Sequence, residues 1–403
     1  MRSTIIAVVF GVALAIAGAV FYGVAGDMLG PSGGGRTVSG VSSDTIVFGQ
    51  TAALDGPVAA LGRGMKTGIE AAFNEANAAG GVKGHKLSLV SVDDGYEPMR
   101  ASALARQLIY RDRVFAMIGP VGTPTSVAVQ TVASDAQVPL IGAFTGADVL
   151  RDPDNANVIN LRASYFQETA AMVDHLITDL GINRIAVFYQ NDAFGQAGLT
   201  GVKHALDQRQ IAIAAEGAYE RNTVDVKSAL AAIQKAAPQA VIMIGAYKPC
   251  AEFIKAARAA KFDPVFLNIS FVGGDALANA LGPEGAGVVV TQVVPFPKDT
   301  RIRVVKDYQA ALKQITPNAA PDFVSLEGYM VGRLVIAAIG KIDGPITRTA
   351  LLDAVKKTET FDLGGIHLQF GAGKNQGSDE VFLTVIQPDG TLQAVDRLAK
   401  TSG

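Results

Sequence analysis

The sequence predicts an α/β protein made of two doubly wound, Rossmann-like lobes. From Thr45 onward, short apolar strands alternate with amphipathic helices, which is the pattern of a parallel sheet covered on both faces. This series occurs twice along the chain, and a length of 403 residues fits two domains better than one core. Two lobes of like design place a cleft between them.

The first series begins the first lobe. We expect strands at 46–50, 87–92, 114–118 and 139–141, and helices at 57–79 and from residue 98. Met65, Ile69 and Phe73 recur at helical spacing in the first of these helices, and Gly80 closes it. Pro98 is expected at the first position of the next helix, where the backbone amide has no partner within the helix and its absence costs nothing.

The second series forms the other lobe. We expect helices at 167–180, 195–209, 224–237 and 249–260, and strands at 185–189, 211–214, 240–244, 264–267 and 288–292. Pro295 and Pro297 then indicate a crossover between the lobes. After it we expect helices at 300–315 and 325–339, and strands at 366–370, 381–387 and 391–395. Glycine turns join these last strands.

The amino end resembles an export signal. A positive start is followed by an uncharged apolar run from Ile5 to Val24. Cleavage after Ala25 would release the chain, but a run of about 20 residues also suffices to span a bilayer. The segment 1–25 is therefore a signal peptide or a membrane anchor, and it contacts the membrane if uncleaved. The glycine- and serine-rich segment 26–43 is predicted to be a flexible linker.

Composition excludes several classes of function. A formal net charge of −2 gives no basic face, so nucleic acid is not an expected partner. The only cysteine, Cys250, allows no disulfide within the chain and is expected to be buried. The four histidines are scattered without metal-ligand spacing, and no phosphate loop or catalytic constellation is present. We expect no metal, no cofactor and no enzymatic activity.

Two loops carry the strongest functional signal. Each follows a predicted strand and is rich in small and hydroxyl residues, at 119–125 and 142–147. The carboxyl ends of parallel strands are where α/β proteins hold ligands. The hydroxyls of Thr123 and Thr145 and the free amides of the loops suit a small anionic group. The alternative for Thr123 is a helix N-cap, which is compatible with a binding role.

An ordered series of motifs resembles a known family. The motifs are the segment 54–62, the segment 77–84, Asp93-Asp94-Gly95-Tyr96-Glu97-Pro98, and the segment 184–187 before Asp192-Ala193-Phe194-Gly195. Together they resemble the leucine/isoleucine/valine-binding-protein family, periplasmic solute receptors of ABC transporters with the type I binding-protein fold. The resemblance covers the chain from about Ser43 to its end.

The resemblance implies two lobes joined by a hinge of three strands. The chain is expected to cross between the lobes near Arg162, near Gln292 and near Phe370. The first lobe would comprise 44–163 and 294–369, and the second lobe 164–293 and 370–403.

The resemblance also implies ligand-binding residues. Thr123 matches a hydroxyl residue that holds a ligand carboxylate. In the second loop the family carries a threonine at the position that aligns with Gly146, and Thr145 lies one residue away from it. We therefore expect Thr145 to bind the ligand together with the amides of Gly146 and Ala147. Four positions complete this prediction: aromatic residues that close over the ligand at Tyr247 and Phe194, unless they are core residues; Leu61 in place of a shielding aromatic; and Tyr165, which lines the cleft or packs at the hinge. Separately, Tyr96 and Gly122 stand where some relatives carry a disulfide pair.

Ser270 is the main departure from the family pattern. The aligned residue in amino acid receptors is an acid that pairs with the ligand ammonium, and a serine cannot neutralise a buried cation. An α-amino acid ligand is therefore in doubt. Asp192 or Glu327 could substitute, although the sequence does not place either carboxylate against the ligand.

These observations predict an exported receptor, in the periplasm or on the outer face of the cytoplasmic membrane. Its partners would be a small polar or carboxylate-bearing solute and the membrane permease of an ABC importer. Hinge bending would close the two lobes over the solute. The alternative is a membrane-tethered sensor that signals closure to a membrane partner.

Overall fold

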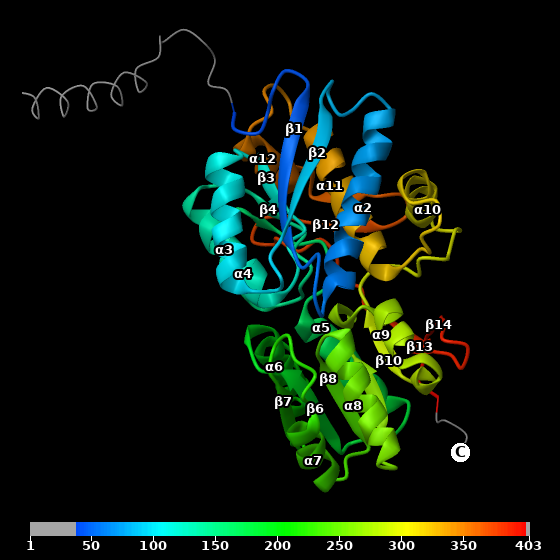
Figure 1. Ribbon diagram of the computed structural model, residues 1–403. Coiled ribbons are helices and arrows are strands. Elements are labelled where there is room, and N and C mark those ends of the chain that lie inside the picture. The colour runs from blue at the N-terminus through cyan, green and yellow to red at the C-terminus, as the bar shows by residue number, and fades with distance from the viewer. Residues whose placement is uncertain (1–37, 400–403) are drawn as a thin grey trace, which may run out of the picture. The chain divides into compact units, whose positions relative to one another are not determined.

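The first lobe is built on a five-stranded parallel sheet in the order β2-β1-β3-β4-β5 (Figure 1). Its strands are β1 (Thr45–Ala52), β2 (Lys86–Asp93), β3 (Ala116–Ile118), β4 (Leu140–Ile141) and β5 (Val158–Ile159). The structure is a computed structural model and describes residues 38–399. The predicted signal or anchor segment 1–25 lies outside the described residues.

Helices from distant parts of the chain cover this sheet. They are α2 (Ala59–Ala78), α3 (Pro98–Arg106), α4 (Thr123–Asp135), α10 (Arg303–Ile315), α11 (Phe323–Gly340) and α12 (Arg348–Thr358). Helices α2 and α11 pack closely, because a Cβ atom on Gly68 would lie 1.9 Å from the Ser325 carbonyl oxygen, and one on Gly328 would lie 2.4 Å from the Met65 carbonyl oxygen. The late segment 303–358 therefore returns to the first lobe.

Helix α11 is the only described helix that is long and apolar enough to cross a membrane. Its mean hydropathy is 1.5, but 78% of the segment is buried within the protein. A helix that is apolar on all sides and buried belongs to the core. Glu327 and Arg333 are the two charged residues of this helix, and Glu327 is its only acid.

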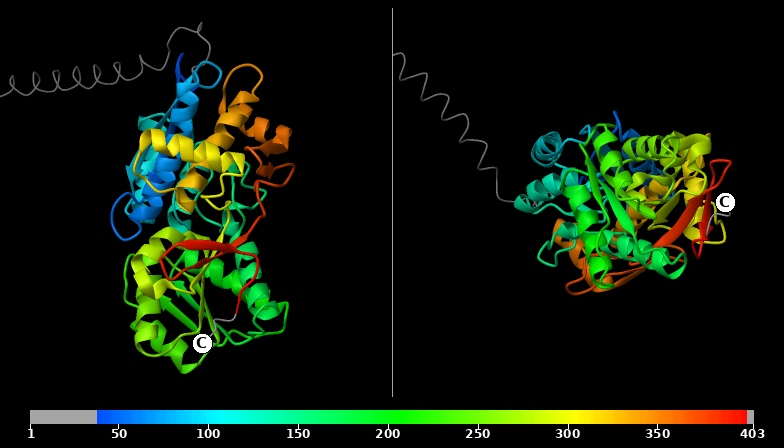
Figure 2. Two further views of the ribbon diagram at one scale, coloured as in Figure 1. Left: turned by 90° about the vertical axis from the view of Figure 1, so that its right-hand side faces the viewer. Right: turned by 90° about the horizontal axis from the view of Figure 1, so that it is seen from below.

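The second lobe holds a seven-stranded sheet in the order β14-β13-β10-β9-β8-β6-β7. Its strands are β6 (Ile185–Gln190), β7 (Glu216–Tyr219), β8 (Ala240–Ile244), β9 (Val265–Asn268), β10 (Val289–Gln292), β13 (Phe382–Ile386) and β14 (Leu392–Val395). Its helices are α5 (Tyr165–Thr178), α6 (Ala193–Asp207), α7 (Lys227–Lys235), α8 (Tyr247–Ala259) and α9 (Gly274–Leu281). Strands β13 and β14 add antiparallel to the parallel core, beside β10 (Figure 2).

The chain passes between the two sheets three times, after β5, after β10 and after β12. Strands β11 (Thr360–Asp362) and β12 (His367–Gln369) form a separate two-stranded sheet. The first and third passages run side by side, because Asn160 bridges Gln376 in parallel and the Ser378 amide donates to the Leu161 carbonyl at 2.9 Å. The two-lobe α/β fold is confirmed, while the residue boundaries of the lobes remain a prediction.

Three local differences separate prediction from structure. The strand expected at 211–214 lies instead at Glu216–Tyr219, where Gly217 weakens the β signal and a Cβ atom added to it would lie 2.9 Å from Ala229. Helices α9 and α12 and the short strands β5 and β11 were not predicted. Residues 38–43 of the predicted linker pack on the first lobe, since Val41 bridges Ile46.

Candidate functional site

Three hydroxyl groups meet at the carboxyl edge of the first sheet. The Oγ1 atoms of Thr123 and Thr145 lie 2.6 Å apart, and Thr145 Oγ1 donates to the Tyr165 hydroxyl oxygen at 3.2 Å. All three side chains are buried. The structure thus brings together two threonines predicted from separate loops and the tyrosine beside the first lobe crossing. Burial raises the pKa of Tyr165, so its hydroxyl stays protonated at neutral pH.

Thr123 is the first residue of α4, and the N-cap position belongs to Gly122. The predicted alternative, in which Thr123 caps the helix, is therefore wrong. Its hydroxyl turns toward Thr145 instead of toward the helix amides. Gly122 has φ +95°, a conformation that suits glycine, and a Cβ atom there would lie 2.1 Å from Cε2 of Tyr96. Positions 96 and 122 are thus adjacent, as the family resemblance requires.

The second loop is held largely by its own contacts. The Ala147 amide donates to Thr145 Oγ1 at 3.2 Å, and the Gly146 carbonyl accepts from the Tyr165 amide at 2.7 Å. The Arg151 guanidinium donates to the Thr145 and Ala147 carbonyls at 3.3 and 3.0 Å. The Ala147 amide, expected to help bind the ligand, is therefore engaged inside the loop.

An aromatic group from both lobes lies beside the hydroxyls. Phe271, on a short 3-10 helix (Ser270–Val272) of the second lobe, stands at its centre. Its ring centroid lies 4.5 Å from that of Phe194, 5.5 Å from that of Phe144 and 6.2 Å from that of Tyr96. Phe194 in turn packs on Tyr165 at 5.5 Å. Sequence reasoning found Phe194 but missed Phe271, although that residue directly follows the predicted Ser270.

Leu61 and Tyr247 contact the opposite lobe at other points. Leu61 on α2 is fully buried. A Cβ atom added to Gly273 of the second lobe would lie 2.5 Å from the Leu61 side chain. Tyr247 begins α8, and its hydroxyl lies beside the backbone of Ala60. Both residues thus bridge the lobes. Within the described residues, no hydrogen bond joins Tyr247 to the Thr123 hydroxyl, whose side-chain partner is Thr145.

Ser270 belongs to a buried charged network. Its amide and its hydroxyl each donate to the Glu168 carboxylate at 2.9 Å, and Thr291 Oγ1 donates to the same carboxylate at 2.6 Å. Arg162 Nη2 donates to Glu168 at 3.1 Å and also contacts Ser270 Oγ. Burial alone would lower the pKa of Arg162, but Glu327 and Glu168 raise it. The first crossing therefore carries a fixed positive charge.

Glu327 approaches this network from the first lobe. Its Oε2 atom lies 3.5 Å from Arg162 Nη1, and its side chain is 3% exposed. Burial raises the pKa of Glu327 to about 7, against the opposing charge of Arg162. Glu327 and Ser270 line one small cavity with room for about one water molecule, so the space between the lobes is largely filled by side chains.

Asp192, the other acid considered as a substitute, is fully engaged. It is the N-cap of α6 and accepts from the Phe194 amide at 2.9 Å. Its second oxygen accepts from Gln190 Nε2 at 2.7 Å and from Arg221 at 3.2 Å. Asp192 is thus a structural cap.

Polar contacts also close the outer seam between the lobes. Glu97 at the start of α3 binds Arg221 at 3.1 Å and Asn222 Nδ2 at 2.7 Å. Deeper in the seam, Gln190 Nε2 donates to the Tyr96 hydroxyl at 3.1 Å. The two lobes of this structure are therefore in direct contact.

Gly122→Ala should destabilise the protein by about 2–6 kcal/mol. The backbone of Gly122, at φ +95° and ψ +151°, is essentially confined to glycine and costs a residue with a Cβ about 1–3 kcal/mol, and the contact with the buried Tyr96 ring adds about 1–3 kcal/mol. Gly84→Ala is the matched control, because Gly84 has φ +85° and nothing lies near its added Cβ. Urea unfolding of both variants separates the two effects. Equal losses would show that Tyr96 moves aside freely.

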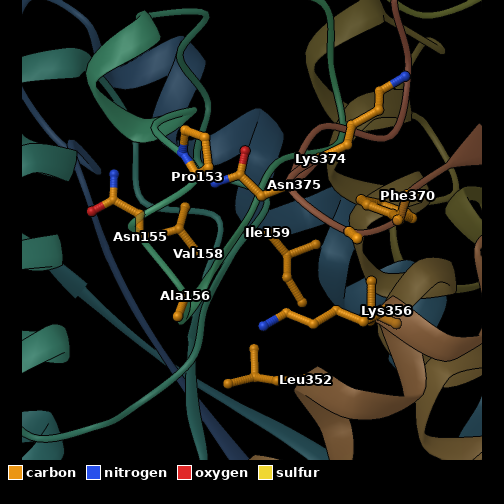
Figure 3. A pocket seen from close by; sticks show the side chains of 14 residues that line it. Pro153, Asn155, Ala156, Val158, Ile159, Leu352, Lys356, Phe370, Lys374 and Asn375 are labelled. Atoms are coloured by element: carbon orange, nitrogen blue, oxygen red, sulfur yellow. The ribbon is translucent and has the colours of Figure 1, made fainter.

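A second cavity lies away from the cleft. It has about 600 Å³ of empty volume and lies between β5, α12 and the segment 370–375 (Figure 3). Its walls are mostly apolar, and the Lys356 side chain runs between Ile159 and Leu352. None of the residues that the sequence predicts for ligand binding lines it.

Comparisons with known proteins agree with this architecture. Residues 45–391 match a family model described as periplasmic binding protein. The Leu/Ile/Val-binding protein BraC3 of Rhizobium johnstonii is 25% identical over 316 residues, which cover 77% of this chain and 83% of that protein.

Solved structures extend the agreement. A possible leucine/isoleucine/valine-binding protein from Rhodopirellula baltica is 39% identical with a TM-score of 0.83, covering 90% of this chain and 98% of that one. A substrate-binding periplasmic protein from Ralstonia solanacearum is 28% identical with a TM-score of 0.81, covering 87% and 99%. The chain therefore belongs to the periplasmic binding protein family, of the leucine/isoleucine/valine-binding type, whose members bind solutes and are not enzymes.

Proposed function

We propose that the protein is the extracytoplasmic solute receptor of an ABC importer, and that it binds a small polar or carboxylate-bearing solute in the cleft between its lobes. The observation that carries this proposal is the buried hydroxyl cluster of Thr123, Thr145 and Tyr165 at the carboxyl edge of the first sheet. Hydroxyl groups in that place can donate to a carboxylate. Phe194 and Phe271 beside them suit an apolar portion of the solute.

Binding is coupled to hinge closure. A solute drives closure only if it binds the closed form better than the open form, which requires contacts to both lobes. Thr123 and Thr145 supply contacts from the first lobe, and Phe194, Tyr247 and Ser270 supply them from the second. The closed form then presents a surface that a permease distinguishes from the open form.

Export supports the same role. The apolar run from Ile5 to Val24 directs the chain across the cytoplasmic membrane, and relatives of this type are periplasmic receptors. The membrane-tethered sensor is the second candidate, and it requires that this run be retained. Mass spectrometry of the mature protein separates the two: a start near Gly26 fits a diffusing receptor, and an intact amino end fits a tethered receptor or sensor.

A thermal-shift screen tests the proposal directly. A solute that binds only the native form raises apparent stability, by about 2.7 kcal/mol at a hundredfold excess over Kd. The panel comprises amino acids, amides, short carboxylates and aromatic acids. Small-angle scattering with and without each hit then shows whether the lobes close. The proposal fails if hits are absent across the panel, or if bound solutes leave the scattering profile unchanged.

Thr123→Val should weaken binding of a carboxylate solute by about 1–3 kcal/mol, or roughly 5- to 150-fold in Kd, because one charge-assisted hydrogen bond is lost. Valine keeps the shape of the side chain. Thr131→Val on the same helix is the control, since the Thr131 hydroxyl only returns to the Val127 carbonyl on an exposed turn. Calorimetric titration measures both variants. Unchanged affinity in Thr123→Val would remove this residue from the site.

A further inference from the structure

An apolar cavity lies beside the hinge, apart from the predicted ligand site. It is the cavity of Figure 3, and its enclosed part measures about 160 Å³, whereas the 600 Å³ of empty volume includes solvent at its mouth. Protein interiors are packed as densely as organic crystals, and voids much larger than a water molecule are few in a domain. A void of this size therefore requires a physical explanation.

Buried apolar side chains form most of its walls. Val158 and Ile159 come from the edge strand β5, Val355 from α12 and Phe370 from the segment after β12, and each of them is at most 7% exposed. An apolar cavity of about 150 Å³ engineered into another protein stays dry and binds benzene. The cavity beside β5 therefore has room for an apolar group of about that size.

The backbone keeps this space open. Asn160 bridges Gln376, so the first and third passages pair there, but the Val158 amide turns back to the Asn155 carbonyl at 3.0 Å. The pairing therefore does not extend along β5. The third passage turns away from β5 over residues 371–374, and the first three residues of this turn are glycine, alanine and glycine. That wall has no side chain large enough to fill the cavity.

One lysine without a counter-charge reaches into the cavity. The Lys356 side chain of α12 runs across it between Ile159 and Leu352 (Figure 3). Among residues 38–399, Lys356 forms no ion pair, and none of the residues that line the cavity is acidic. The alkyl stem of a lysine packs on apolar surface while its ammonium stays near water. An apolar cavity and a free cation at its mouth suit an amphipathic anion.

The other lysines nearby already have partners. Lys357, the next residue of α12, lies 4.0 Å from Asp353. Lys374, which also lines the cavity, pairs with Asp379 at 2.9 Å, and its side chain points away from the cavity in Figure 3. Lys356 is thus the one lysine at this cavity, within the described chain, whose charge is left for a ligand.

We propose that this cavity is a second binding site, which takes a small monocarboxylate whose apolar part is about the size of a benzene ring. The apolar part packs between Val158, Val355 and Phe370, where burial of its surface favours binding. The carboxylate pairs with the Lys356 ammonium at the mouth. This site shares no residue with the hydroxyl cluster of Thr123, so it goes beyond the proposed function and does not depend on it.

The test uses three probes that differ only in charge. They are phenylacetate, the neutral 2-phenylacetamide and the cationic phenethylamine, each titrated at neutral pH into the full-length protein with labelled methyl groups. Methyl NMR signals report where each probe binds: those of Ile159 and Val355 report on the cavity, and those of Leu61 report on the contact between the lobes.

Two variants test the cavity itself. Lys356→Met removes the charge and keeps an apolar stem, and Lys357→Met is the matched control on the same helix. Ala156→Phe places a ring at the rim of the cavity, where Ala156 is exposed. Circular dichroism and thermal unfolding first establish that all variants fold.

The inference predicts a specific pattern. Phenylacetate should shift the Ile159 and Val355 signals in a saturable way, in Thr123→Val as in the unaltered protein. Loss of the ion pair in Lys356→Met should raise its Kd roughly three- to tenfold, and 2-phenylacetamide should bind the unaltered protein more weakly by a similar factor. Lys357→Met should bind as the unaltered protein does, and Ala156→Phe should abolish the shifts.

Contrary results are distinguishable. If phenylacetate shifts only the Leu61 signals and binds more weakly to Thr123→Val, it binds in the cleft, and the inference is overturned while the proposed function stands. If the cavity signals respond equally to all three probes and Lys356→Met changes nothing, the carboxylate class is wrong. Cavity signals that stay unshifted at millimolar phenylacetate would also overturn the inference.

Discussion

Replacing Arg162 by methionine should lower the free energy of unfolding by about 3–5 kcal/mol, because it leaves a buried carboxylate without its counter-charge. Arg162 is 1% exposed and donates to Glu168, which is fully buried. The guanidinium also lies over the Phe144 ring, 5.1 Å from its centroid. Methionine retains much of this apolar packing, so the loss reports mainly on charge. Chemical denaturation at pH 7.5 measures it.

The double variant Arg162→Met/Glu168→Gln is the companion experiment. Glutamine at position 168 carries no charge and still accepts from the Ser270 amide, so most of the lost stability should return. A double variant as unstable as the single one would show that the hydrogen-bond geometry around Arg162, and not its charge, stabilises the crossing.

The order of helices and strands was predictable because it depends on local patterns. Alternating apolar runs and helical spacing located both sheets, and glycine-rich strand ends located the two hydroxyl loops. The contact between Thr123 and Thr145 followed from one topological rule, that neighbouring parallel strands bring their carboxyl ends together. The position of the second-lobe edge strand was missed because its sequence, Glu216–Tyr219, contains a glycine and a charge.

The charged network could not be derived in the same way. Arg162 and Glu327 are separated by more than 160 positions, and only the return of α11 to the first lobe brings them together. One signal was available: Glu327 is the single acid in a predominantly apolar helical segment, and an acid in such a place is buried with a partner or a function. Which partner it has is a property of the folded chain.

The role of Phe271 could not be predicted from the sequence either. An aromatic residue after a strand is more often a core residue than a contact in a cleft, and sequence alone does not decide between them. The structure places its ring against Phe144 of the first lobe and Phe194 of the second. Ser270 and Phe271 thus act together, with the serine anchored by Glu168 and the ring extending between the lobes.

Glu327 should also make stability depend on pH in the absence of any solute. Burial raises its pKa from 4.5 to about 7 in the folded protein, against the attraction of Arg162. Between these two values the folded state holds a proton that the unfolded state has released, so stability falls as the pH rises. This contribution of Glu327 to the free energy of unfolding is complete below about pH 4.5 and is lost as the pH passes 7. Its full size is about 3 kcal/mol.

Glu327→Gln should remove this dependence of stability on pH, and it removes no other contribution to stability of similar size. Compared with the unaltered protein, the variant should gain about 3 kcal/mol in relative stability between pH 4.5 and pH 8. The comparison cancels other groups that titrate in this range, such as Asp94 and Asp275, whose pKa values burial raises to about 6. Urea unfolding across the pH range gives the difference, with Glu70→Gln as the control, since it removes a half-exposed carboxylate that pairs with Lys66. A constant difference would mean that Glu327 stays ionised in the folded state, with Arg162 supplying more stabilisation than burial removes.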